Sequence, residues 1–66
     1  MARYALRFET EDGTLEEPFH YMVRKDDAIR AAKLAARDTA CLDIVRVHVD
    51  DTRTDLGVFV APVKKE

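Results

Sequence analysis

The side chains best suited to chemistry in this sequence are two histidines, one cysteine and several carboxylates. His20 and His48 with Asp50 or Asp51 form a plausible metal-ligand set, since imidazole and carboxylate both bind transition metals. Cys41 beside either histidine has the residue types of a nucleophile pair. However, nothing in the spacing forces these groups together, and a lone cysteine is more often a small buried apolar residue. The sequence therefore predicts no metal and no cofactor.

Other catalytic arrangements are excluded because the chain lacks the residues that they need. The chain contains no serine, and Gly13 and Gly57 are its only glycines, which excludes a glycine-rich phosphate-binding loop. A thin two-layer domain also offers little depth for a substrate pocket. We therefore predict that the protein is not an enzyme and expect no small-molecule substrate.

The length of the chain favours association with another chain. Its 66 residues allow a single domain, 1–66. A domain of this size buries only about 60% of the surface that its unfolded chain exposes. Below roughly 70–80 residues one core is seldom generously stable without a disulfide, a metal or a partner. Because Cys41 is the only cysteine, no disulfide can form within the chain, and we expect a homodimer or another protein partner.

The overall charge and hydropathy narrow the class of protein further. A formal net charge of -2 is not the strongly basic balance typical of nucleic-acid-binding domains. The sequence has no apolar run long enough to span a membrane and no signal-peptide core. Together with the single free cysteine, these features predict a cytoplasmic protein with no membrane partner.

The elements that would position these side chains can be read from the periodicity. A helix is expected at 26–39, where acidic residues are followed by strong helix formers without a breaker. Alternating stretches predict strands at about 3–10, 19–24, 42–50 and 56–60, with hairpin turns at 11–14 and 50–55. The expected fold class is α+β, a two-layer ββαββ domain with a four-stranded, mainly antiparallel sheet and one helix on one face. The strand order is left open.

Alternation assigns each strand residue to one of two faces. The expected helix-facing set is apolar and consists of Tyr4, Leu6, Phe8, Phe19, Tyr21, Val23, Val45, Val47, Val49, Leu56, Val58 and Val60. The other set consists of Arg3, Ala5, Arg7, Glu9, His20, Met22, Arg24, Ile44, Arg46, His48 and Phe59. A single helix covers only one face, so the second set is expected to be open to solvent. It holds four arginines against one acid.

The open face is the predicted binding surface. Its candidate residues are Arg3, Arg7, Met22, Arg24, Arg46, His48 and Phe59. Arginine, methionine and aromatic residues are enriched in protein interfaces, so we expect a small interaction module that self-associates through this face or through an edge strand. The alternative is a nucleic-acid-binding accessory protein whose arginines follow phosphates while Phe59 stacks on bases. A third interpretation gives this face no binding role, because arginine stems often lie along neighbouring residues.

Several short patterns are shared with known small proteins. The chain opens Met1-Ala2-Arg3-Tyr4, turns through the acidic loop 11–14, continues with an alanine-rich helix over 28–36 and has a Val47-His48-Val49-Asp50 strand. In this layout it resembles small uncharacterised ββαββ proteins of bacteria and phages. The resemblance implies a bacterial or phage origin and the same two-layer fold. It implies no activity and assigns no site residue.

Overall fold

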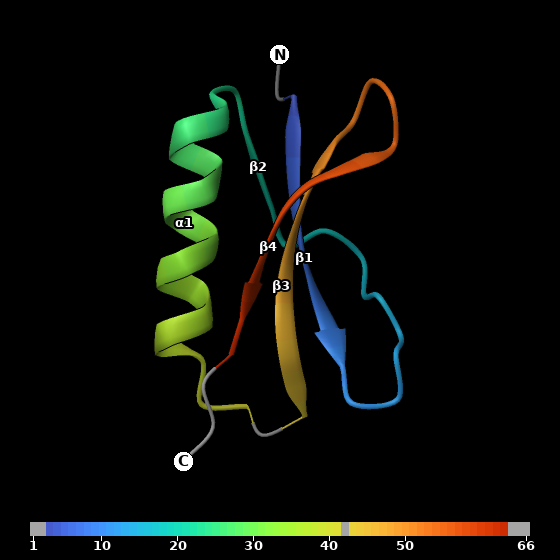
Figure 1. Ribbon diagram of the computed structural model, residues 1–66, viewed down its shortest axis with the longest axis vertical. Helices are drawn as coiled ribbons and strands as arrows, with labels where there is room; N and C mark the ends of the chain where they lie inside the picture. The colour runs from blue at the N-terminus through green and yellow to red at the C-terminus, as the bar shows by residue number, and fades with distance from the viewer. Residues whose placement is uncertain (1–2, 42, 64–66) are drawn as a thin grey trace.

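Figure 1 shows the computed structural model, which describes residues 3–41 and 43–63. The elements in this part of the chain are β1 Tyr4–Thr10, β2 His20–Met22, α1 Lys25–Asp38, β3 Ile44–Asp51 and β4 Leu56–Pro62. The predicted beginning of the third strand at Leu42 lies outside the described residues. The helix packs on one face of a four-stranded antiparallel sheet, which confirms the predicted α+β fold class.

The strand order, which the sequence left open, is β2-β1-β3-β4. All three neighbouring pairs are antiparallel. The two strands of each hairpin, β1 with β2 and β3 with β4, pair with each other. The connection through the helix then places β3 beside β1. The edges of the sheet are therefore β2 and β4.

Beyond β2, the returning chain continues to border β1. The Thr10 N–H donates to the Thr14 carbonyl at 2.9 Å, and the Glu16 N–H donates to the Phe8 carbonyl at 2.9 Å. These two bonds flank an isolated antiparallel bridge between Glu9 and Leu15. The stretch 14–17, which we call the acidic segment because it contains Glu16 and Glu17, thus extends the β2 edge along the second half of β1.

The helix lies close to the sheet because its inner face is made of alanine. Ala28, Ala32 and Ala36 are buried and recur every four positions, which keeps them on one side of the helix. The helix begins and ends one residue before the predicted 26–39, with acids in its first turn and Arg37 in its last. No helix in the described part of the chain is both long enough and apolar enough to span a membrane.

The core lies between α1 and the two central strands. Tyr4, Leu6, Val47 and Val49 are buried against the helix alanines and Ala61, with Phe8 half-buried beside them. The predicted helix-facing residues of β1 and two of those of β3 are therefore confirmed. In the described part of the chain the single helix covers one face of the sheet and no helix covers the second face, on which Ala5, expected to be open to solvent, is nevertheless buried.

The predicted face assignment of β2 is wrong. Met22 lies directly opposite Tyr4, and directly opposite residues share a face, so Met22 packs on the helix side and Tyr21 is exposed on the other. His20, predicted on the open face, lies opposite Leu6 and therefore belongs to the helix side. The regular strand is only three residues long, so alternation counted from Phe19 has too little length to set the register.

The face assignment of β4 is also wrong for Phe59 and Val60, for a different reason, although Val58 packs against the core as predicted. Phe59 lies opposite Val49 and packs against the core, whereas Val60 lies opposite His48 and is exposed. The register shifts between Val49 and Asp50, where Val58 is the extra residue of a β-bulge. Such a bulge changes the face on which later residues lie relative to a strict alternation.

Three other residues depart from the predicted faces. Ile44, expected on the open face, is buried, and the sheet has a second irregularity beside it between Glu9 and Thr10. Leu56 and Val23, expected to face the helix, are both exposed. These departures all occur at strand ends, where pairing and bulges decide which side a residue takes.

Candidate functional site

Three of the seven predicted binding residues come from the two central strands, and a fourth, Arg3, immediately precedes one of them. Arg7 lies opposite His48, and Arg46 lies opposite Glu9, so these side chains share the open face. Arg3 immediately precedes β1, where its carbonyl accepts a hydrogen bond from the Thr52 N–H at 2.8 Å. The structure therefore brings Arg7, Arg46 and His48 to the open face, whereas the guanidinium of Arg3 lies over the ring of Tyr4, a helix-side residue.

Each of these three arginines lies beside a carboxylate. Arg3 Nε is 3.6 Å from Asp51 Oδ2, and Arg7 Nε is 3.1 Å from Asp50 Oδ2. We expected a single acid on this face because residues 50–55 were predicted to form a turn. Instead β3 extends to Asp51 and carries two more carboxylates beside the arginines. The expectation that this face holds four arginines against a single acid is therefore wrong.

Glu9 lies at the centre of the third charged group. One of its carboxylate oxygens is 2.7 Å from Arg46 Nη1 and the other is 2.6 Å from His48 Nε2. The hydrogen bond with His48 lowers the pKa of Glu9, desolvation opposes this effect, and the charge of Arg46 adds to it. The carboxylate thus joins β1 to β3 across the open face.

The other three predicted binding residues lie elsewhere. Met22 and Phe59 pack on the helix side of the sheet, for the reasons of register given above. Arg24 has an extended backbone at the residue before α1, outside β2. The apolar centre that Phe59, Met22 and Ile44 were expected to form on the open face is therefore absent among the described residues.

The residues considered for catalysis or metal binding do not form a cluster. Among residues 3–41 and 43–63, no group of three or more histidine, cysteine or acidic side chains is placed to hold a metal ion. Cys41 is exposed, so the expectation that it is a buried apolar residue is wrong. His48 is engaged with Glu9, while His20 lies on the other face of the sheet.

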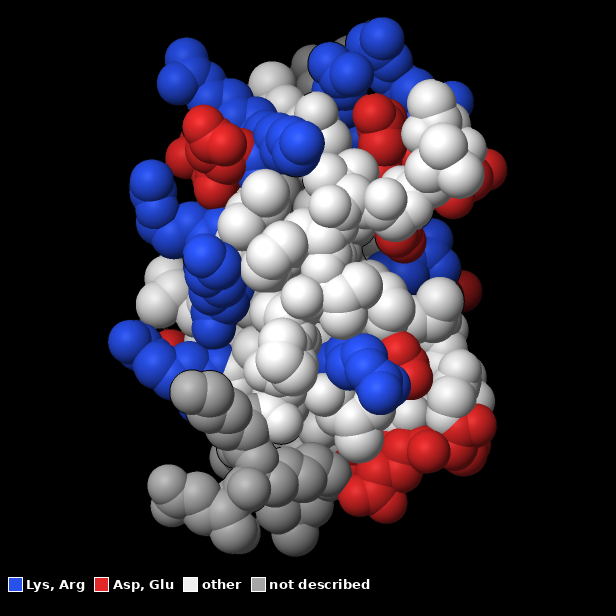
Figure 2. Space-filling model, viewed as in Figure 1, with Lys and Arg blue, Asp and Glu red and all other residues white. Residues whose placement is uncertain are grey.

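Sequence reasoning missed the surface beside β4. Figure 2 shows uncharged atoms running down the middle of the molecule over β4, with lysine and arginine side chains over α1 along one side. A groove of about 510 Å³ lies between the helix and this strand. It is lined by Lys33, Ala36, Arg37, Phe59, Ala61 and Pro62.

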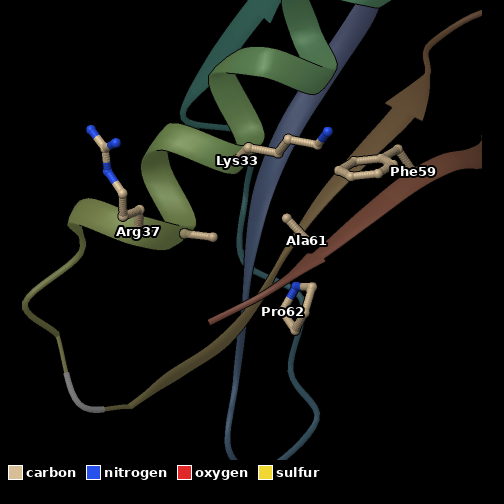
Figure 3. Close-up of a pocket in the computed structure, with 6 residues that line it drawn as sticks. Lys33, Arg37, Phe59, Ala61 and Pro62 are labelled. Atoms are coloured by element: carbon tan, nitrogen blue, oxygen red, sulfur yellow. The ribbon is translucent and has the colours of Figure 1, made fainter. Parts of the chain in front are cut away.

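The groove has an apolar floor and a basic rim. Lys33 and Phe59 reach toward each other across it, with the Lys33 Nζ 5.7 Å from the centre of the ring, whereas Arg37 points away from it (Figure 3). Arg37 instead pairs with Asp38 at 3.1 Å. No ion pair found among the described residues involves Lys33. Lys33 is therefore the cation of this rim that an acidic group could reach.

Within residues 3–41 and 43–63, the backbone of β4 has one side without a neighbouring strand. The Val63 N–H donates to the Val45 carbonyl at 3.0 Å, so Val63 directs its polar groups toward β3. Backbone groups of successive residues in an antiparallel strand point to opposite sides, so Ala61 and Phe59 also face β3. Val60 and Pro62 consequently face away from the sheet.

Pro62 was the sequence signal for this edge, since proline is tolerated where a strand has no neighbour to accept its N–H. The predicted strand stopped at about residue 60, whereas β4 includes Pro62. Comparison of the chain with protein-family models, curated proteins and solved structures gave no match.

Proposed function

We propose that the protein is a non-enzymatic interaction module that self-associates through the β4 edge of its sheet. The observation that carries this proposal is the outward-facing backbone of β4, which is bordered by the apolar groove and by the exposed side chains of Leu56 and Val60. An unpaired edge strand is a template on which a further strand adds by main-chain hydrogen bonds.

The edge is a better candidate than the open face. Side chains that would be desolvated on the open face include Arg7, Arg46 and their carboxylates, and removing such pairs from water is costly. Along β4 the groups to be buried are backbone amides, which gain partners, and apolar side chains. Pairing there would also enlarge the small core of this chain.

The same ion pairs weaken the nucleic-acid alternative. Phosphates would have to compete with Asp50 for Arg7 and with Glu9 for Arg46 on the open face. Any such binding is therefore expected to be weak even at low salt, where the electrostatic contribution of phosphates is largest. The exposed thiol of Cys41 fits a reducing compartment, and we propose the cytoplasm.

The test is the mass of the protein in solution as a function of concentration. We expect the average mass in sedimentation or light scattering to rise with concentration for the wild type and to stay that of one chain for Val60→Lys. A lysine at this position places a charge in the new sheet, a device that natural edge strands use against pairing.

Leu34→Lys is the matched control. Leu34 is 44% exposed and Val60 is 43% exposed, but Leu34 lies on the helix, away from the β4 edge. The control variant should associate like the wild type. A wild-type chain that stays monomeric at all concentrations, or a Val60→Lys chain that still associates, would contradict the proposal.

A further inference from the structure

The acidic segment has backbone N–H and carbonyl groups that point away from the sheet and could pair with those of β4. The bonds of the Thr14 carbonyl and the Glu16 N–H both run to β1, so the N–H and carbonyl of Leu15, the residue between them, point away from the sheet. The Leu15 side chain is 47% exposed. Both outer edges of the sheet thus present an apolar residue with outward backbone groups, Leu15 on one and Val60 on the other.

The directions of the strands also match. The acidic segment is antiparallel to β1, β1 is antiparallel to β3, and β3 is antiparallel to β4. The acidic segment and β4 therefore run in opposite directions. A second copy placed beyond β4 in the same orientation presents its acidic segment antiparallel to β4, with both helices on the same side of the extended sheet.

Building on the proposed self-association, we propose that the acidic segment of one copy adds to β4 of the next, with Leu15 opposite Val60. Leu15 shares a face with Glu9, and Val60 shares a face with His48, so both side chains lie on the open face and meet there. This contact is heterologous: each copy uses two different surfaces, and association propagates from head to tail.

In this register the charges on the other face are complementary. Glu16 follows Leu15 and lies opposite Phe59 on the helix side, over whose ring Lys33 is already placed. The Glu16 carboxylate therefore comes close to Lys33, which takes part in none of the ion pairs found among the described residues. Glu17 adds to the negative charge of the incoming strand.

Two-fold pairing of β4 with β4 of a second copy lacks this complementarity. Such a pairing centred on Val60 brings the groove rim that carries Lys33 in one copy next to the same rim of the other. Like charges that face one another across an interface select against it. The acidic segment supplies the opposite charge to the same rim.

The experiment uses two variants that each block one surface. Leu15→Pro removes the outward N–H of the acidic segment, and Val60→Pro removes the outward N–H of β4; neither N–H faces a neighbouring strand of its own chain. Each variant alone should remain a monomer in sedimentation. An equimolar mixture should form a dimer and nothing larger, because only one functional acidic segment and one functional edge remain.

Each other outcome has a definite meaning. If Leu15→Pro associates like the wild type, or if the mixture of two folded variants stays monomeric, the head-to-tail arrangement is wrong while self-association through β4 stands. If the wild type itself never associates, the proposed function fails as well. Circular dichroism checks the fold, and Leu15→Lys with Val60→Lys serves as a second pair if either proline variant unfolds.

A charge swap tests the register. Lys33→Glu should weaken association at least about fivefold at low salt, since it sets two carboxylates together, and adding Glu16→Lys to the same chain should restore most of the affinity. Failure of the double variant to recover, with both chains folded, would overturn the assignment of Glu16 to Lys33.

Discussion

The open face and the β4 edge belong to one sheet, yet they differ in which of their groups have partners. On the open face, Arg7 and Arg46 each lie within ion-pair distance of a carboxylate, although Arg7 Nε makes no hydrogen bond within the described part of the chain. Along β4, Val60 turns its N–H and carbonyl away from the sheet, and Lys33 is in none of the ion pairs found among the described residues.

This difference matters because binding replaces solvent contacts with new ones. A charged group that already has a partner loses water on binding without gaining a new interaction. A surface of paired charges therefore contributes little favourable free energy to the binding of a ligand. An unpaired strand edge gains hydrogen bonds, and an apolar groove gains buried area. The number of arginines on a surface is therefore a poorer guide to binding than the number of groups left unpaired.

The largest effect on stability is expected at Phe59, which belongs to the edge and to the core. Phe59→Ala should lower the free energy of unfolding by about 2 kcal/mol, less than for a fully buried ring because one side of Phe59 borders the groove. Urea unfolding measures the change. Tyr21→Ala is the matched control: its exposed ring on the open face should contribute less than about 0.5 kcal/mol.

Equal losses at Phe59 and Tyr21 would place both rings in similar surroundings and remove the distinction between the two surfaces. A larger loss at Tyr21 would restore the face assignment that alternation predicted. The comparison therefore tests the bulge as well as the groove, since it is the bulge after Val49 that turns Phe59 toward the helix.

The helix, β1 and part of β3 could be predicted because their signals are local. Ala28, Ala32 and Ala36 show the helix period, and Tyr4 and Leu6 show the strand period in a stretch where no bulge intervenes. The faces of β2 and β4 depend on register, which is set by pairing with another strand and is not encoded in the alternation of either strand alone.

The candidate site was harder to predict than the fold. Sequence alone leaves open that β4 is an edge, because the helix crossover permits more than one strand order. It also hides the pairing of Arg7 with Asp50, since the carboxylate belongs to a stretch that reads as a turn. Counting charges on a predicted face therefore overestimated how basic that face is.

A second prediction concerns Glu9, the central carboxylate of the open face. Its pKa is lowered by the hydrogen bond with His48 and by Arg46, so its interactions stabilise the fold above its unfolded pKa and are lost as the pH falls through the folded pKa. Glu9→Gln should therefore be less stable than the wild type at pH 7. The difference should shrink below about pH 4.5 as the wild-type carboxyl takes up a proton.

Urea unfolding of both proteins from pH 7 to pH 3 measures this difference. Glu17→Gln is the control, since Glu17 is an exposed glutamate that lies outside β1 and β3. The stability of this variant should follow that of the wild type at each pH. A Glu9→Gln protein that keeps the same difference from the wild type at pH 3 as at pH 7 would show that the paired charges of the open face do not hold β1 to β3.

The smallest effect is expected in the turn that precedes the acidic segment. Asp12 accepts hydrogen bonds from the Thr10 hydroxyl and, at 3.0 Å, from the Thr14 N–H, and these bonds lower the pKa of Asp12 to about 2. Asp12→Ala should reduce stability slightly at neutral pH. Because the folded pKa lies below the unfolded value, the wild-type advantage is present above about pH 3.8 and is lost as the pH falls toward 2.

The same variant connects the turn to the proposed contact. The Asp12 bonds hold Thr10 and Thr14 together at the start of the acidic segment, so their loss should loosen Leu15 and Glu16 and weaken association modestly, while β4 stays unchanged. In the mixing experiment, Asp12→Ala should therefore weaken the dimer when it is placed in the Val60→Pro chain, which supplies the segment. Placed in the Leu15→Pro chain, which supplies β4, it should have no effect. Equal effects in both chains would mean that the turn acts through general stability alone.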